Sequence, residues 1–110
     1  MTNEEILNVK SPKEYVGGPY AVVLKNDVDM WAIVALEWEG ERTLGIRWFN
    51  TKYGMPVTHR ANKTYSLWFR LPQDILGAIL STVEDSIKES VEDFLSGKIT
   101  GEDLKQKLEL

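Results

Sequence analysis

The sequence predicts a single α+β domain, in which a four-stranded antiparallel sheet is followed by a long C-terminal amphipathic helix and a short final helix. Three observations support this prediction. The chain has 110 residues, 43% hydrophobic and 27% charged, which are ordinary values for one globular domain. Segments rich in β-branched and aromatic residues alternate with turn residues in the first two thirds. An apolar pattern of helical period fills the last third.

The four strands are separated by recognisable turn residues. Asn26 and Asp27 suit a tight turn after the first strand, and Gly40 suits a hairpin after the second because glycine readily adopts positive φ. Gly54 and Pro56 mark a polar loop, residues 51–62, before the fourth strand. The predicted strands cover residues 20–25, 28–39, 43–50 and 63–71.

A helix is predicted over residues 74–96, with Gly97 as its stop. At 1.5 Å per residue it would be about 35 Å long, more than a four-stranded sheet needs. Its distal part is therefore predicted to pack against a second copy, which makes the chain a homodimer or higher homo-oligomer. The alternative is that Leu104 and Leu108, on the final helix at 101–110, fold back on it within one chain.

The predicted organisation is a lead-in at residues 1–19, one folding domain at 20–96 and the short final helix within 97–110. No apolar run reaches the roughly 18 residues that a membrane span requires. The first ten residues are polar and acidic, unlike a signal peptide, and the chain has no cysteine. These features favour an intracellular, cytoplasmic protein that does not contact membranes.

Charge is segregated along the chain. Residues 42–73 contain six cations and no acidic residue, whereas both flanks are acidic and the whole chain has a net charge of −4. Six of the eleven aromatic residues lie in the same stretch. Cations neutralise phosphates and flat rings stack on unpaired bases, so this composition is typical of surfaces that bind single-stranded nucleic acid.

Strand alternation predicts which of these side chains share a face. Leu44, Ile46 and Trp48 share one face of the third strand, and being apolar they are expected to meet the helix. The opposite face then presents cations beside large rings, covered by a nucleobase, a second subunit or the loop 51–62. The nucleic-acid-binding residues predicted on this face and in the loop are Arg47, Phe49, Lys52, Tyr53, Arg60, Lys63, Trp68 and Arg70.

The predicted function is binding of single-stranded nucleic acid, DNA rather than RNA, through phosphate neutralisation and base stacking. The alternative is a protein-interaction or assembly module whose aromatic face is buried in a homo-oligomer. A third interpretation is a solvated surface in which the cations pair with Glu37, Glu39 or Glu41 across the hairpin. The sequence contains no nucleophile–base pair, no phosphate loop and no metal-ligand spacing around its single His59, so neither catalysis, a metal nor a cofactor is predicted.

Two short motifs give the chain a family resemblance. Trp38-Glu39-Gly40 is an aromatic-x-Gly turn, and Ile46-Arg47-Trp48 is an Ile-Arg-aromatic strand. Together with the strand–strand–strand–strand–helix order over about residues 20–90, they resemble the single-stranded-DNA-binding domain of the transcriptional coactivator positive cofactor four family, in particular its bacterial-type relatives. The resemblance implies a homodimer with a sheet face that binds single strands through Arg47, Trp48, Trp68 and Arg70. A looser resemblance, to small archaeal single-stranded-DNA-binding proteins with a C-terminal oligomerising helix, implies the same ligand.

Overall fold

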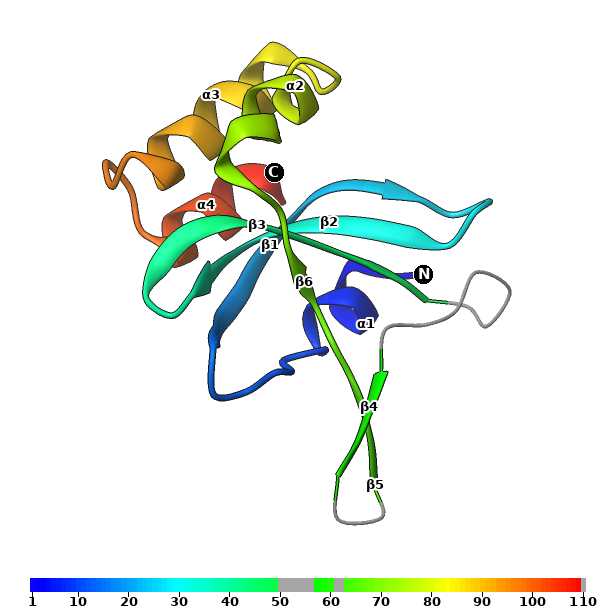
Figure 1. Cartoon of the computed structure of the whole chain (residues 1–110). Coiled ribbons are helices and arrows are strands. Elements are labelled where there is room, and N and C mark those ends of the chain that lie inside the picture. Colours follow the sequence, from blue (N-terminus) through cyan, green and yellow to red (C-terminus); the bar gives the residue numbers. More distant parts are fainter. Residues whose placement is uncertain (50–56, 61–62, 110) are drawn as a thin grey trace.

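The computed structural model describes residues 1–49, 57–60 and 63–109, and in 57–60 and 63–66 it describes the backbone alone. Its main sheet has four antiparallel strands in the order β1-β2-β3-β6 (Figure 1). The hairpin between β2 and β3 is regular, because Trp38 pairs with Glu41 at its closed end and Trp31 pairs with Trp48 at its open end. The predicted four-stranded antiparallel sheet is therefore confirmed. The strands are β1 (Val16–Asn26), β2 (Trp31–Trp38), β3 (Glu41–Trp48) and β6 (Phe69–Arg70).

The predicted fourth strand, residues 63–71, is divided in two. β5 (Lys63–Ser66) pairs with β4 (Val57–Arg60) in a separate two-stranded hairpin, and β4 falls within the segment predicted as loop. Only β6 joins the main sheet, where Phe69 pairs with Ile46. The division occurs at Trp68, whose backbone N–H donates to the Ser11 carbonyl (2.9 Å) and so connects the chain here to the N-terminal segment.

The prediction of one helix over residues 74–96 is wrong. Ser81 and Thr82 end the first helical segment, because their hydroxyls donate to the carbonyls of Ala78 (2.6 Å) and Ile79 (2.7 Å) and compete with continuation of the helix. Glu84 has extended backbone and begins a new helix. The helical elements are η1 (Gln73–Ile75, a 3-10 turn), α2 (Leu76–Leu80), α3 (Asp85–Leu95) and α4 (Gly101–Leu108).

The short helices remove the length argument for a second copy. Leu104 of α4 is fully buried together with Val91 and Phe94 of α3, so the final helix folds back within one chain. α4 begins as its sequence predicts, since Thr100 and Asp103 form a capping box in which each side chain accepts a hydrogen bond from the other residue's backbone N–H. None of the helices in the described ranges is long and apolar enough to cross a membrane.

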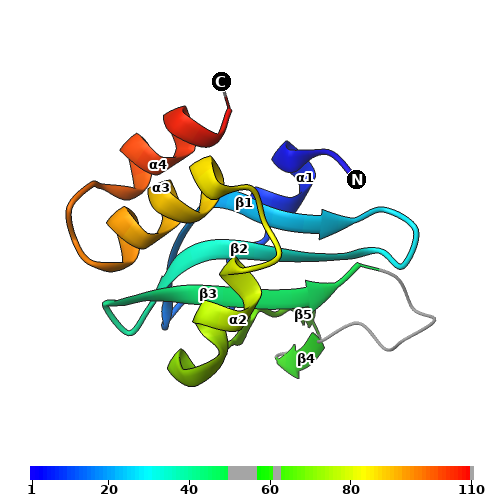
Figure 2. The ribbon, with the colours of Figure 1, turned by 90° about the horizontal axis from the view of Figure 1, so that it is seen from above.

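Both faces of the main sheet are covered. On one face, α3 and α4 cover the sheet, as the view from above shows (Figure 2). Ala35 and Leu44 of the sheet share one core cluster with residues of these two helices. The opposite face packs against Ile6 of α1 (Asn3–Leu7) and against Trp68. Residues 1–19, predicted as a lead-in, thus contain a core residue and the first part of β1.

Arg42, the first cation of the acid-free stretch, connects β3 to the helices. Its Nη1 donates to the carbonyl oxygens of Phe94 (2.8 Å) and Ile99, and its guanidinium carbon lies 4.8 Å from the centre of the Phe94 ring. These contacts satisfy carbonyls at and beyond the C-terminal end of α3, where a positive charge is favourable. Arg42 therefore has a structural role.

The hydroxyl of Tyr20 donates to Glu37 Oε2 (2.7 Å), and burial together with this hydrogen bond raises the pKa of Tyr20 from 10.0 to about 12. The neutral phenol is thus favoured in the folded state. The stabilisation that the neutral Tyr20 side chain gives the folded state is complete below pH 10 and is lost as pH rises from 10 to about 12. We expect the free energy of unfolding to fall by about 1–2 kcal/mol across this window.

Urea unfolding measured between pH 9 and pH 12 checks this expectation. Tyr20→Phe is the control: it loses about 1 kcal/mol at pH 9, because the hydrogen bond is removed, and its stability should fall less with pH. Equal slopes in the two proteins would show that Tyr20 does not titrate with a raised pKa.

Candidate nucleic-acid interface

The predicted division of side chains between the two sheet faces is correct at the centre of the sheet. Leu44 and Ile46 lie in the core under the helices, and Trp68 lies on the opposite face. That opposite face is not open, however. It is covered by α1 and the residues that follow α1. A nucleobase, a second subunit or the loop 51–62 had instead been expected to cover this face. The sequence signal was the apolar set Ile6, Leu7 and Val9 within an otherwise polar segment, all of which join this core.

Trp68 is a core residue in this structure. Its side chain is only 1% exposed, and its indole Nε1 donates to the Val9 carbonyl (2.6 Å). Phe49 is partly buried and packs edge-to-face on the Trp68 ring, with ring centres 6.0 Å apart. Both rings hold the N-terminal segment on the sheet, so Trp68 presents no free face to a base in this conformation.

Arg47 is also covered, with 1% of its surface exposed. Its Nε donates to the Trp48 carbonyl (3.2 Å), and its guanidinium carbon lies 4.4 Å from the centre of the Phe49 ring. Within the described part of the chain, Nη1 is buried without a hydrogen-bond partner. Burial lowers the pKa of Arg47, because a desolvated cation is unfavourable. Arg47 therefore does not contribute a surface charge in this conformation.

Arg70 lies at the surface of β6 and is paired. Its Nη2 is 2.7 Å from Glu41 Oε2, and the same carboxylate accepts a hydrogen bond from Gln73 Nε2 (2.8 Å). The solvated-surface interpretation expected cations of the stretch to pair with Glu41, and here the pair joins β6 to β3. Exposed pairs of this kind stabilise by about 0–1 kcal/mol. A phosphate could replace Glu41 as the partner of Arg70 at small cost.

The remaining predicted cations belong to one segment, residues 50–66, which we call the basic arm. Lys52 and Tyr53 lie outside the described residues, and Arg60 and Lys63 are placed by their backbone alone. Arg60 and Lys63 are direct cross-strand partners at the end of the β4–β5 hairpin, which extends away from the main sheet (Figure 1).

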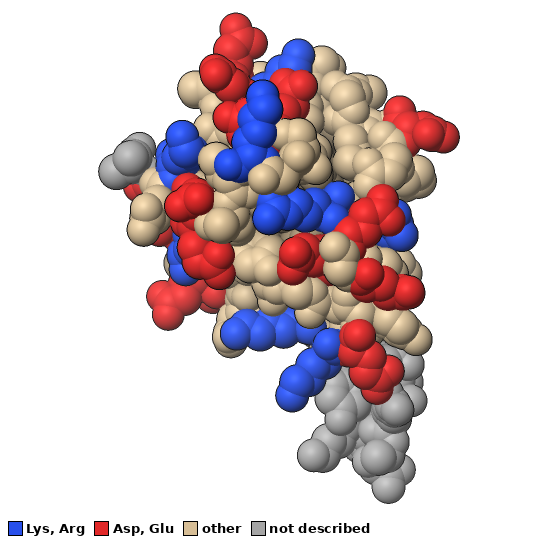
Figure 3. All heavy atoms as spheres, turned by 90° about the vertical axis from the view of Figure 1, so that its left-hand side faces the viewer, with Lys and Arg blue, Asp and Glu red and all other residues tan. Residues whose placement is uncertain are grey.

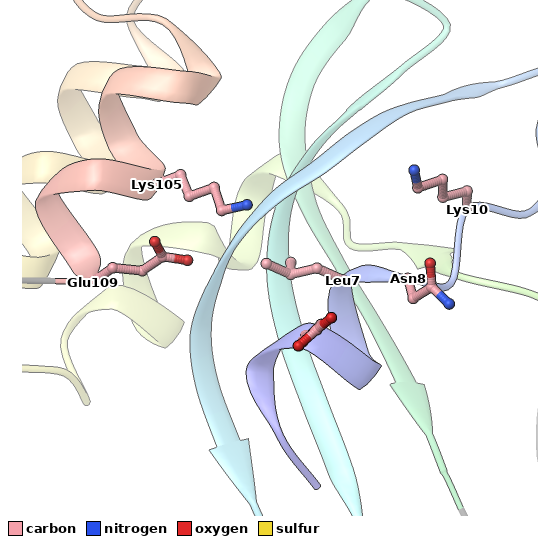
Figure 4. Close-up of a pocket in the computed structure, with 6 residues that line it drawn as sticks. Leu7, Asn8, Lys10, Lys105 and Glu109 are labelled. Atoms are coloured by element: carbon pink, nitrogen blue, oxygen red, sulfur yellow. The ribbon is translucent and has the colours of Figure 1, made fainter.

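The body of the protein has a different charge distribution. On the face shown in Figure 3, Lys and Arg side chains are interspersed with Asp and Glu side chains. An open cavity of about 400 Å³ between α1 and α4 has the same mixed character, because Glu4, Lys10, Lys105 and Glu109 all line it. Figure 4 shows Lys105 and Glu109 on one side and Lys10 on the other. Among the residues that the structure describes, no group of three or more His, Asp and Glu side chains is arranged to hold a metal ion.

Sequence reasoning missed the exposure of Phe69 on the edge strand β6 and the partial exposure of Trp48. Trp48 was expected to be core with Leu44 and Ile46, but it is partly exposed and belongs to neither core cluster of the described residues. Phe69 is 54% exposed, and Trp31 is partly exposed. The sequence did contain a signal for the pairing of Trp31 with Trp48, because a tight turn at Glu39–Gly40 fixes the register of the β2–β3 hairpin.

Comparison with known proteins yields no relative: no family model, curated protein or solved structure matches this chain. The resemblance to single-stranded-DNA-binding families stays a prediction.

Proposed function

We propose that this protein binds single-stranded nucleic acid, DNA rather than RNA, and that the basic arm makes the phosphate contacts. The observation that carries the proposal is the backbone position of Arg60 and Lys63, which are cross-strand partners in a hairpin outside the main sheet. No acidic residue lies between positions 42 and 73 to neutralise them locally. A projecting cationic segment attracts a polyanion even though the whole chain is acidic, because local potential governs association.

The structure narrows the set of cations available for this role. Arg42 binds backbone carbonyls and Arg47 is buried, so two of the six cations in the stretch are occupied by structural contacts or covered. Lys52, Arg60 and Lys63 of the arm are the principal candidates, with ion-paired Arg70 at the edge of the sheet. Each phosphate contact releases counterions, so the affinity should fall steeply as salt rises.

The test is a triple variant, Lys52→Gln, Arg60→Gln and Lys63→Gln, titrated against a labelled thymine oligonucleotide of about 25 nucleotides with fluorescence anisotropy as the readout. We expect at least a tenfold loss of affinity at low salt. The slope of log K against log salt should also become shallower by about 2, since three contacts are lost at about 0.7 each.

The matched control is Lys98→Gln, Lys105→Gln and Lys107→Gln, which removes the same number of charges from exposed positions around α4. Its affinity should stay within about threefold of the native value, because these side chains are interspersed with acids. Equal losses in the two variants would indicate an effect of net charge alone and would contradict a site on the arm.

A protein-interaction module is the second candidate, and exposed Phe69 on the edge strand β6 favours it. Apolar burial responds weakly to salt, whereas phosphate binding responds strongly. Binding to the oligonucleotide that vanishes at moderate salt would therefore support nucleic acid. A mass that rises with protein concentration at any salt, without oligonucleotide binding, would support self-assembly.

A further inference from the structure

We infer that Arg70 and Gln73 form a phosphate subsite at the edge of the main sheet, and that the Glu41 carboxylate occupies this subsite in the free protein. Glu41 is then an intramolecular competitor, which a phosphate of the bound strand must displace. This role of Glu41 rests on the proposed function and adds to it a contact by which the chain limits its own affinity. All three side chains are exposed and lie in the described part of the chain.

Two donors from different elements converge on one carboxylate. Arg70 Nη2, on β6, lies 2.7 Å from Glu41 Oε2, and Gln73 Nε2, on η1, donates to Glu41 Oε1 over 2.8 Å. The chain between the two donors is fixed to the sheet, because the Leu71 N–H donates to the Leu44 carbonyl (2.9 Å). Each carboxylate oxygen therefore has its own donor, and a phosphate, which also presents two oxygens side by side, suits the same pair of donors.

The competing carboxylate is held weakly enough to be displaced. The Arg70 side chain is 35% exposed and the Glu41 side chain is 52% exposed, so water screens their attraction. A released Glu41 carboxylate stays in water and carries no desolvation cost. Arg70 keeps its place when the carboxylate leaves, because its backbone is held in β6 as the cross-strand partner of Gly45.

A phosphate of a nucleic-acid strand can displace this carboxylate. Arg70 and Gln73 belong to the acid-free stretch, residues 42–73, and Glu41 is the acidic residue that immediately precedes it. The β3–β6 pairing brings the two ends of the stretch together, so Glu41 meets Arg70. A guanidinium binds phosphate oxygens as it binds carboxylate oxygens. Contact with a strand phosphate also releases counterions, a gain that a carboxylate on the same chain does not provide.

The experiment is a cycle of substitutions in the anisotropy titration with the thymine oligonucleotide. Glu41→Gln should bind about 2- to 5-fold more tightly than Glu39→Gln, the upper factor corresponding to about 1 kcal/mol for a released surface pair. Glu39→Gln is the matched control, because Glu39 is an exposed acid in the same hairpin turn and its removal changes the net charge equally.

Arg70→Gln should bind more weakly than the native protein, with a salt slope shallower by about 0.7 because one phosphate contact is lost. In the Arg70→Gln protein, adding Glu41→Gln should change the affinity no more than adding Glu39→Gln does. In the Glu41→Gln protein, Gln73→Ala should weaken binding about 2- to 5-fold, since the competitor is gone and only a contact to phosphate is removed.

Failure of the native protein to bind the oligonucleotide would overturn the proposed function and the role of Glu41 together. Salt-dependent native binding, with equal affinities of Glu41→Gln and Glu39→Gln, would overturn the competition and leave the function standing. A gain from Glu41→Gln that persists undiminished in the Arg70→Gln protein would also overturn it, because Glu41 would then act through its charge alone. Thermal unfolding verifies each variant, and these exposed positions lie outside both core clusters of the described residues.

Discussion

Replacing Trp68 with alanine is expected to reduce the free energy of unfolding by about 3–5 kcal/mol, the range for truncating a large buried ring. The ring is 1% exposed and lies between the sheet and the N-terminal segment, in contact with Phe49. The substitution also removes the indole N–H that donates to the Val9 carbonyl, so this partly buried acceptor loses its side-chain partner. Urea unfolding followed by circular dichroism measures the loss.

Trp38→Ala is the control for this experiment. Trp38 is partly exposed and stacks on Tyr15 with ring centres 5.8 Å apart, so we expect its removal to cost about 1–2 kcal/mol. A loss below about 1 kcal/mol in Trp68→Ala would contradict its place in the core. The result also bears on binding, because any reduced affinity of Trp68→Ala would then follow from loss of the fold rather than from loss of a stacking contact.

Replacing Gly101 with alanine is expected to destabilise the protein by about 1–3 kcal/mol, the usual cost of forcing an extra carbon into a packed site. A Cβ at this position would clash with the ring of Tyr20. The ring packs edge-to-face on Phe94 and its hydroxyl is held by Glu37, so it cannot move without loss. α4 would have to move away from β1. The shift in the urea midpoint measures the effect.

Gly77→Ala provides a matched substitution in a helix that does not create a clash. Gly77 lies in α2, and a Cβ there would meet nothing within 4 Å of the described structure. Alanine should therefore leave stability unchanged or raise it by about 0.5–1 kcal/mol, because it restricts the unfolded chain more than glycine does. Similar destabilisation by both substitutions would contradict the close packing of Gly101 on Tyr20.

Much of the sheet and the start of α4 could be predicted from local patterns, whereas the division of the preceding helical region into α2 and α3 could not. The β2–β3 hairpin follows from β-branched runs on both sides of Glu39–Gly40, which are local signals. An apolar period continues from Leu76 to Leu95, so nothing in it marks the break at residues 81–84. The break depends on hydroxyl–carbonyl hydrogen bonds and on the packing of α4, which periodicity does not report.

The candidate site could likewise be predicted only as far as local patterns reach. Alternation correctly assigned Trp68 to the face away from the helices, but it does not say what covers a face. The cover comes from residues 1–11, more than fifty positions away in sequence. Phe69 is the cross-strand partner of Ile46 on the helix side, yet the short helices leave it 54% exposed. Exposure of a ring depends on which distant segments reach it, so the sequence alone could not show which aromatic rings are exposed.

The most direct test of the proposed function is an anisotropy titration of a labelled thymine oligonucleotide of about 25 nucleotides with the native protein, at low and moderate salt and with a duplex of equal length in parallel. We predict saturable binding to the single strand, weaker binding to the duplex, and an affinity that falls roughly 100-fold for a tenfold rise in salt if three phosphates are contacted. No change in anisotropy at low salt, with protein shown to be folded, would contradict the proposed function.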